Sequence, residues 1–259
     1  MHRFYLPPGE SLEPCLLLTG REAHHAQHVV RIRRGERVAV LDGAGQEFLC
    51  EVQGDDRSGV RLAVLEKHFQ PAPRCRVTLL QAVPKGRIME AIIQKATELG
   101  VFRIVPLLTE RVVPQIGDET SGNKAVKWHL AAIEAIKQCG SAWLPEIMPP
   151  LTPARFLALP ERSELSLIAS LQSGSRPARD YFQAFQAKVG RTPLSVCVWV
   201  GPEGDFTLAE TELIQAKGVL PITLGRLVLR TETAAIYCLS VLNYELQLPT
   251  AAEPTSYQP

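Results

Sequence analysis

Residues 1–70 alternate between short apolar runs and clusters of turn-forming residues. The runs are CLLLT, RVAVL, EFLCEV and VRLAVLE, and pairs such as Asp42-Gly43 and Ser58-Gly59 separate them. One helix is expected to interrupt these strands near 21–30. Strands this short and this closely spaced predict a small β-barrel domain over 1–70, with a proline-containing linker at 68–75.

From residue 76 the pattern changes to apolar runs that alternate with stretches of helical periodicity. The runs RVTLLQAV, VFRIVPLL, LSLIAS, SVCVWV and LPITL predict buried strands. Between them lie stretches that predict helices, near 88–99, 122–139 and 178–189. This alternation indicates an α/β domain over 76–248, with a parallel sheet of about five strands and helices on both faces. A proline-rich connection is expected at 145–160 and a disordered tail at 249–259.

Two loops of unusual composition follow the last two predicted strands. The loop 201–204, Gly-Pro-Glu-Gly, comes after SVCVWV, and the loop 224–233 comes after LPITL. Each precedes a helix, because Thr207 and Glu210 have the spacing of a capping box and Thr231 is placed to cap the final helix. Open α/β sheets bind ligands at the carboxyl ends of their strands, so we expect the two loops to form one ligand pocket.

The loop 201–204 does not carry a standard phosphate-binding motif. The loop 201–204 lacks the Lys-Ser or Lys-Thr of a Walker A loop and the spacing G-x-G-x-x-G. The simplest alternatives are a tight Gly-Pro turn without a ligand and, for Thr231, an ordinary helix cap. Arg230 suits an anionic or base-edge partner beside the pocket. Lys85-Gly86-Arg87, before the first helix of the α/β domain, is interpreted as a helix-start turn.

A second concentration of polar residues lies within 21–37, where five Arg and two Glu give a local charge of +3. Its histidines and clustered arginines are His24, His25, His28, Arg31, Arg33 and Arg34. His24 and His28 can share a helix face, but two histidines do not complete a zinc site, so we expect no metal. A solvated charged face is the simple alternative, and contacts to RNA phosphates and bases are the functional one.

Composition changes this picture little. The chain has 259 residues, of which 46% are hydrophobic, and a net charge of +1. Nucleic-acid binding would therefore depend on local patches rather than on global charge. No apolar run is long enough to span a membrane, and the N-terminal residues do not resemble a signal peptide. Six cysteines are scattered without a C-x-x-C pair, and four of them sit inside apolar strand or helix patterns, which predicts buried thiols in a reducing cytosol.

Several motifs occur in the order found in a known family. GPEGDF, LGRLVLRTETAA, KGRIMEAIIQKATELGV and QCGSAWLPEI lie in the large domain, and HHAQHVVRIRRGERVAVLDGAGQEF lies in the small one. With these motifs the chain resembles the RsmE-like SPOUT methyltransferases over residues 2–245. Members of that family use S-adenosylmethionine to methylate N3 of a uridine in the 16S ribosomal RNA of the small subunit.

The resemblance implies features of the fold and partners that the hydrophobic pattern does not show. The large domain would be a SPOUT α/β-knot domain with a deep trefoil knot at its C-terminal end, a rare topology. The small domain would be a PUA-like β-barrel that binds RNA. The protein would act in the cytoplasm as a homodimer on the 30S subunit, with RNA reaching the site across subunits and without a metal or a membrane.

The resemblance also implies roles for individual residues. S-adenosylmethionine would be held by three loops, through Ser170, Leu171, Gly201, Pro202, Glu203, Gly204, Leu220, Leu224, Gly225, Leu229, Thr231, Thr233 and Ala234. RNA would contact His24, His25, His28, Arg31, Arg33 and Arg34. The catalytic candidates are Arg230, Glu232, Arg3 and Arg226. An arginine would stabilise the uridine anion, and Glu232 would either accept the proton or orient Arg230.

Four positions depart from the family pattern. Asp205 stands where glycine is common, Leu227 where arginine is usual, Lys137 where an acidic residue is common, and Ser141 where arginine is usual. These departures keep two alternatives open: a non-catalytic RNA-binding or ribosome-assembly protein, and a SPOUT methyltransferase for a different RNA site. A nucleotide-dependent enzyme is disfavoured by the missing Lys-Ser or Lys-Thr.

Overall fold

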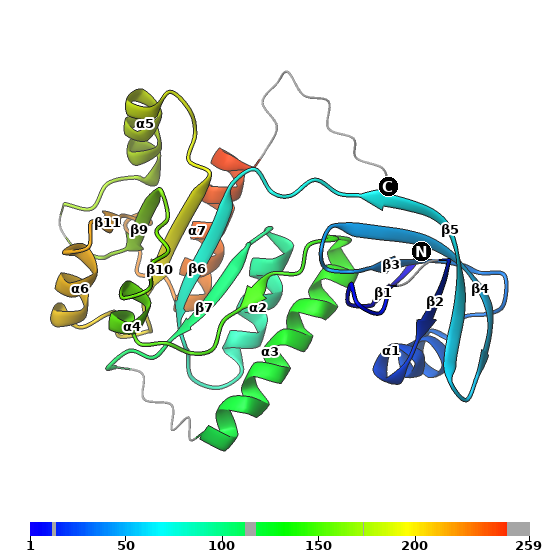
Figure 1. The fold of residues 1–259 in the computed structure, drawn as a ribbon. Helices are drawn as coiled ribbons and strands as arrows, with labels where there is room; N and C mark the ends of the chain where they lie inside the picture. The colour runs from blue at the N-terminus through cyan, green and yellow to red at the C-terminus, as the bar shows by residue number, and fades with distance from the viewer. Residues whose placement is uncertain (12–13, 112–117, 173, 248–259) are drawn as a thin grey trace. The chain divides into compact units, whose positions relative to one another are not determined.

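The computed structural model describes residues 1–11, 14–111, 118–172 and 174–247 (Figure 1). The chain divides into two compact units. The first comprises 1–72 and 132–145, and the second comprises 73–131 and the chain from 146 onward. The expected domain boundaries stay a prediction, and the expected tail at 249–259 lies outside the described residues.

The first unit contains a five-stranded sheet in the order β1-β3-β4-β5-β2. Its strands are β1 (His2–Tyr5), β2 (Cys15–Leu18), β3 (Arg37–Leu41), β4 (Gln46–Asp56) and β5 (Gly59–Phe69). Strand β1 pairs with β3 in parallel, and the other pairs are antiparallel. The sequence pattern did not predict β1, because the run HRFY is short and places only Phe4 in the core.

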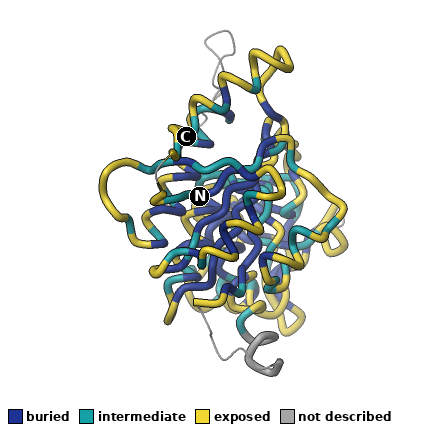
Figure 2. The backbone as a smooth tube through the Cα atoms, turned by 90° about the vertical axis from the view of Figure 1, so that its left-hand side faces the viewer, coloured by how far each residue is buried: buried dark blue, intermediate teal, exposed yellow. Residues whose placement is uncertain are grey.

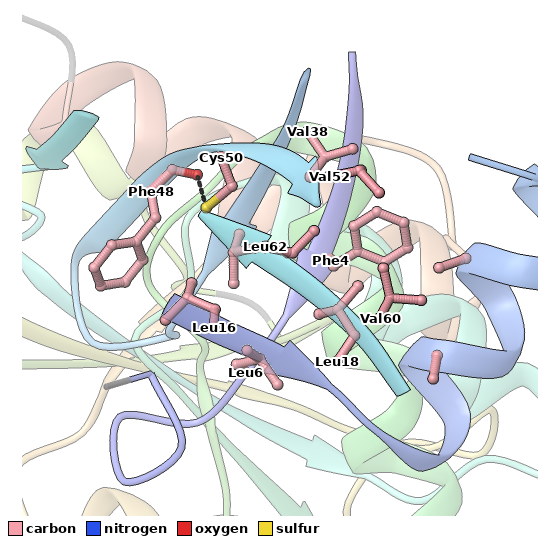
Figure 3. Close-up of a cluster of buried hydrophobic side chains, with 13 residues drawn as sticks. Phe4, Leu6, Leu16, Leu18, Val38, Phe48, Cys50, Val52, Val60 and Leu62 are labelled. Carbon is pink, nitrogen blue, oxygen red and sulfur yellow. Dashed lines mark hydrogen bonds between the residues drawn. The ribbon is translucent and has the colours of Figure 1, made fainter. Parts of the chain in front are cut away.

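The expected helix near 21–30 is present as α1 (Gly20–His24) continued by a π-helical turn, η1 (His25–Val30). It ends at Arg31, whose φ of 59° is left-handed. All five strands contribute side chains to one apolar cluster, of which Phe4, Leu16 and Leu62 are central members (Figure 3). The apolar alternation in the sequence therefore marks the inner face of this sheet.

The second unit contains a parallel sheet in the order β11-β9-β10-β6-β7-β8. Its strands are β6 (Arg76–Ala82), β7 (Arg103–Leu107), β8 (Glu146–Ile147), β9 (Leu165–Ala169), β10 (Ser195–Val200) and β11 (Leu220–Ile222). The predicted parallel α/β architecture is confirmed. The sheet has six strands rather than about five, because the two-residue β8 lies in the proline-rich connection and is too short to leave a pattern.

Helices cover both faces of this sheet. The helices of the second unit, with α3 shared between the units, are α2 (Ile88–Glu98), α3 (Asp118–Cys139), α4 (Pro153–Leu157), α5 (Ala178–Val189), α6 (Leu208–Gln215) and α7 (Thr231–Leu246). Side chains from α4 and α6 pack with Trp199 and Leu80 on one face. Helix α7 packs against α2, β6 and β10 on the other. The strands between the helices are buried along most of their length (Figure 2).

Helix α4 was not predicted, although Thr152 caps it by accepting a hydrogen bond from the backbone N–H of Arg155 and Pro153 occupies its first turn. Proline is favoured at that position because its missing N–H has no helical partner there. The sequence predicts a proline-rich connection over 145–160, but in the structure one of these prolines, Pro153, begins a helix.

Candidate functional site

Three segments at the carboxyl ends of neighbouring strands enclose one cavity of about 60 Å³. They follow β9, β10 and β11, and the last continues into α7. The lining residues are Ala169, Ser170, Leu171, Val200, Gly201, Pro202, Glu203, Asp205, Leu224, Gly225, Leu227, Val228, Leu229, Thr231 and Ala234. The structure thus brings Gly201 and Gly225 to a single cavity at the sheet edge where open α/β folds bind ligands.

Thr231 joins the ends of two strands through its buried hydroxyl. The Oγ1 atom donates to the carbonyl oxygen of Gly201 at 2.6 Å and accepts from Nε2 of Gln81 at 2.8 Å. Thr231 is 3% exposed and Gln81 is fully buried. The expectation that Thr231 caps α7 is wrong, because Arg230 is the N-cap residue and its side chain makes no capping bond. The hydroxyl instead fixes the loop after β10.

Local packing and backbone conformation explain why Gly201 and Gly225 are glycines. A Cβ atom at Gly201 would lie 2.9 Å from Oδ1 of Asp205 and 3.2 Å from the ring of Phe206, so the turn that follows excludes a side chain. Gly225 has open space around it, but its φ of 111° disfavours any other residue. Asp205 adopts φ 61°, a conformation that glycine takes freely and aspartate tolerates. This departure from the family pattern is therefore compatible with the turn.

The loop 201–204 is also held by the segment after β7. Arg111 donates from Nη1 to the carbonyl oxygen of Gly204. The carboxylate of Glu210 accepts from the backbone N–H of Glu110 at 2.9 Å and from that of Thr207 at 2.9 Å. The predicted capping box at Thr207 and Glu210 is confirmed. Glu210 thus ties the start of α6 to the segment that follows β7.

The cavity lining agrees only in part with the residues expected to hold a ligand. Gly204, Leu220 and Thr233 do not line it; Leu220 begins β11, and Thr233 is exposed on α7. Five lining residues were not foreseen, namely Ala169, Val200, Asp205, Leu227 and Val228. Ala169 and Val200 are the last residues of β9 and β10. Asp205 directly follows the loop 201–204, and Leu227 and Val228 lie within the loop 224–233. Extending each expected loop by its neighbouring residues would have included all five.

The charged residues that line the cavity, Glu203 and Asp205, are both acidic. Arg226, Arg230 and Glu232 lie in the same loop and helix start but do not line the cavity. Arg226 and Arg230 are exposed, and neither has an ion-pair partner among the residues that the structure describes. Two guanidinium groups are therefore available to an external anion beside the cavity.

Arg3 belongs to the first unit and is not among the residues that line the cavity. Its Nη1 lies 3.5 Å from the carbonyl oxygen of Gln138, and its Nε is buried without a hydrogen-bond partner. A Cβ atom at Gly140 would lie 3.0 Å from the guanidinium. This packing gives Arg3 a structural environment, and its catalytic role stays a prediction.

The histidine and arginine cluster of the first unit is split between surface and core. His24 and His28 are exposed, with ring centroids 4.7 Å apart, as their spacing predicted. Arg31, Arg33 and Arg34 are also exposed. His25 instead packs edge-on against Phe4, with centroids 5.9 Å apart. The exposed members remain candidates for RNA contacts, and the packing of His25 indicates a structural role.

Two departures from the family pattern have local explanations. Lys137 is buried and its Nζ lies 3.0 Å from a carboxylate oxygen of Glu22 and 3.2 Å from one of Glu134. Ser141 exchanges hydrogen bonds with the backbone of Trp143. Both side chains are therefore engaged within the first unit rather than free to contact RNA.

No group of three metal-ligating side chains occurs within the described segments. Across the same residues, none of the helices has both the length and the apolar character that crossing a bilayer requires. Cys50, Cys75, Cys197 and Cys238 are buried, whereas Cys15 and Cys139 are exposed, so the expectation of buried thiols holds for only part of the set.

Comparisons with known proteins give consistent matches. The family profile described as an RNA methyltransferase domain matches residues 70–243, and the profile described as an RNA methyltransferase PUA domain matches residues 18–65. A relative from Synechocystis sp. named Ribosomal RNA small subunit methyltransferase E is 33% identical, over 95% of this chain and 78% of its own. The Bacillus subtilis protein of the same name is 30% identical, over 91% and 92%.

A protein from Legionella pneumophila, solved in complex with the cofactor SAM, has a TM-score of 0.84 and 33% identity to this chain. The match covers 94% of this chain and 97% of that one. The similarity therefore extends over both units and is not confined to the motifs around the cavity.

Proposed function

The chain belongs to the ribosomal RNA small subunit methyltransferase E family, and from that membership we propose that it transfers a methyl group from S-adenosylmethionine to N3 of one uridine in 16S ribosomal RNA. The observation that carries the proposal is the cavity formed by the segments after β9, β10 and β11. The similar protein from Legionella pneumophila was solved with this cofactor bound.

The residues around the cavity fit S-adenosylmethionine. Glu203 and Asp205 complement a ligand that carries a sulfonium and an ammonium group, and Leu171, Val200 and Leu229 supply the apolar wall that an adenine ring needs. The triphosphate of a nucleotide would instead be repelled by the two carboxylates. The lining therefore favours the methyltransferase over the nucleotide-dependent alternative.

The cavity is smaller than the roughly 300–1,000 Å³ typical of small-molecule sites. We therefore expect the segment 224–229 to move outward when the cofactor binds. Leu227 and Val228 in this segment are each 76% exposed, so few contacts oppose such a movement.

The bound cofactor supplies a methyl group already activated by the sulfonium, so the chain's own task is to position the uridine and to manage a proton. N3 of uridine must lose its proton, and the resulting charge spreads onto the carbonyl oxygens. Arg230, exposed between two lining residues, would stabilise that charge, with Arg226 as a second candidate. Glu232 in the first turn of α7 would accept the proton or orient Arg230.

The test is transfer of tritiated methyl from S-adenosylmethionine to 30S particles and to naked 16S RNA, followed by identification of the labelled nucleoside. Label in 3-methyluridine supports the proposal, whereas label in another nucleoside identifies a different RNA site. Calorimetry that detects no cofactor binding would instead favour the non-catalytic RNA-binding alternative.

Replacing Arg230 by alanine tests its assigned role. Loss of one preorganised charge-stabilising group typically costs 10²–10³ in kcat, so we expect a fall of that order in kcat with little change in cofactor affinity. Arg155→Ala, which removes an exposed arginine on α4, is the matched control. Full activity of Arg230→Ala on 30S particles would show that Arg230 has no catalytic role.

The finer topology of both units is part of the proposal. Backbone hydrogen bonds hold the end of β11 on the segment that leaves β9, from Ser170 to Ile222 and between Arg176 and Thr223. Helix α6 packs on one face of the sheet and α7 on the other, so the chain crosses between faces after β11. We propose that this crossing completes a trefoil knot. In the first unit, we propose that β1 and β2 curve around their shared core to form a PUA-like barrel.

We also propose that the protein acts as a homodimer in the cytosol, where its ribosomal substrate is found. A groove of about 700 Å³ runs between α5 and α7, with Tyr237 and Tyr244 exposed along it. Exposed aromatic side chains beside an apolar groove are typical of protein interfaces. Sedimentation equilibrium of the wild type and of Tyr244→Glu tests this, since the charge is expected to shift the mass toward that of a monomer.

A further inference from the structure

A second cavity, of about 330 Å³, opens at the carboxyl end of β6. It lies between the β6–α2 connection and the first half of α3, wholly within the second unit. The residues that line it are Val83, Pro84, Lys85, Gly86, Arg87, Met89, Glu90, Lys124, Lys127 and Trp128. It is therefore separate in its lining from the cavity after β9, β10 and β11.

This second cavity is strongly basic. Four cations line it, Lys85, Arg87, Lys124 and Lys127, against one carboxylate, Glu90. Among the residues that the structure describes, none of the four cations has an ion-pair or side-chain hydrogen-bond partner, whereas nearby cations such as Lys95 are paired. Four like charges held together without partners raise the free energy of the folded chain, which an anionic ligand would relieve.

The residues that line the cavity indicate which part of a nucleic acid it would bind. Trp128 is 4% exposed and Met89 is 2% exposed, so together they form a buried apolar floor. An enclosed tryptophan offers no face on which a base can stack. The exposed groups are cationic side chains, which bind phosphates rather than reading bases. The chemistry thus matches the phosphodiester backbone.

The cavity also lies at the sheet edge where the uridine must be methylated. Strand β6 pairs directly with β10, with Gln81 opposite Val200, and neighbouring strands lie about 4.8 Å apart. Gln81 also bonds Thr231 beside the first cavity. A single RNA strand that presents one nucleotide to the first cavity would carry its neighbouring phosphates along this edge.

We propose that the basic cavity binds phosphates of the RNA strand that flank the methylated nucleotide. This inference rests on the proposed function and extends it to the substrate's backbone. Its physical consequence is a salt-dependent contribution to RNA affinity, because neutralised phosphates release counterions.

The test compares Lys124→Gln/Lys127→Gln with Lys188→Gln/Lys217→Gln, which removes two exposed lysines of the same unit that lie outside the basic cavity. Each variant is measured for RNA affinity over a range of salt concentrations, for KM and kcat with 30S particles, and for S-adenosylmethionine affinity by calorimetry. A second variant, Lys85→Gln/Arg87→Gln, alters the other wall, and circular dichroism establishes that every variant is folded.

We expect the cavity variants to raise KM for 30S particles about tenfold, with cofactor affinity unchanged. The slope of log K against log salt should fall by roughly 1.4 to 1.8, since each single-stranded or duplex phosphate contact contributes about 0.7 to 0.9. The control should keep the wild-type slope and KM.

An unchanged salt slope and KM in both folded cavity variants would overturn the inference. Calorimetry with inorganic phosphate and with uridine monophosphate provides the second arm. If the cavity variants lose binding of these small anions while RNA affinity is unchanged, the cavity takes a free phosphate and the RNA assignment is wrong. Failure of the proposed function is distinguishable, since it would appear as absent methylation by the wild type.

Discussion

Replacing Thr231 by valine tests whether the first cavity depends on the bond between two strand ends. Valine keeps the shape of threonine and removes the hydroxyl, which donates to Gly201 at 2.6 Å and accepts from Gln81 at 2.8 Å. Each lost hydrogen bond costs about 1 kcal/mol net, and a buried group left unsatisfied costs about 1–3 kcal/mol. Nε2 of Gln81 keeps a bond to the carbonyl oxygen of Ala82 at 2.9 Å, so the main penalty falls on Gly201.

We therefore expect Thr231→Val to lower the free energy of unfolding by about 2–4 kcal/mol. Because Gly201 lines the cavity and its carbonyl is held by this hydroxyl, the dissociation constant for S-adenosylmethionine should rise about 10- to 100-fold, equivalent to about 1.4–2.8 kcal/mol. Urea unfolding followed by circular dichroism measures the first effect, and calorimetry measures the second.

Thr97→Val is the matched control. Its hydroxyl is equally buried and donates at 2.8 Å to the carbonyl oxygen of Ile93, which the helix already satisfies. That substitution should cost about 1 kcal/mol or less and leave cofactor affinity unchanged. If Thr231→Val behaves like Thr97→Val in both assays, the hydroxyl does not organise the cavity and the reasoning fails.

Two further predictions concern groups away from the cavity. Lys137→Met leaves Glu22, whose side chain is 12% exposed, without its cation, so this variant should lower the free energy of unfolding by about 3–5 kcal/mol. The double variant Lys137→Met/Glu22→Met should restore most of that loss. Near-equal urea midpoints for the single and double variants would contradict this prediction. Burial raises the pKa of Cys238 from 9.0 to about 12, so the unfolded chain releases this proton first and the free energy of unfolding should fall as pH rises from 9 to 12. Cys238→Ala should lose about 2 kcal/mol less than the wild type between pH 9 and 11, measured by urea unfolding at each pH; identical losses would refute the assignment.

Local patterns predicted the elements that define the first cavity. The run SVCVWV became β10 over the expected residues, and Thr207 with Glu210 formed the expected capping box. Both depend on contacts within a few residues, which sequence spacing determines directly. Strands β1 and β8 escaped prediction because their pairing with β3 and β7 stabilises them, and four- and two-residue runs carry no period of their own.

The roles that local sequence did not reveal share one physical cause. Thr231 had the identity and position of a helix cap, yet its hydroxyl bonds Gly201 and Gln81, which lie 30 and 150 residues away along the chain. Lys85-Gly86-Arg87 was correctly interpreted as a helix-start turn, because α2 begins at Ile88. The role proposed for Lys85 and Arg87 in phosphate binding becomes apparent only because α3 brings Lys124 and Lys127 to the same cavity.

The parallel sheet therefore does more than support the first cavity. In a parallel sheet every strand ends at the same edge, so residues distant in sequence gather there whatever their local roles. On this chain the edge carries an acidic cavity after β9, β10 and β11 and a basic cavity after β6, and β6 is the direct neighbour of β10. A cationic cofactor and an anionic RNA strand need opposite charges within a short distance of each other, and this edge supplies both. Neutralising the basic cavity should consequently weaken RNA binding without weakening cofactor binding, a separation that one mixed site would not allow.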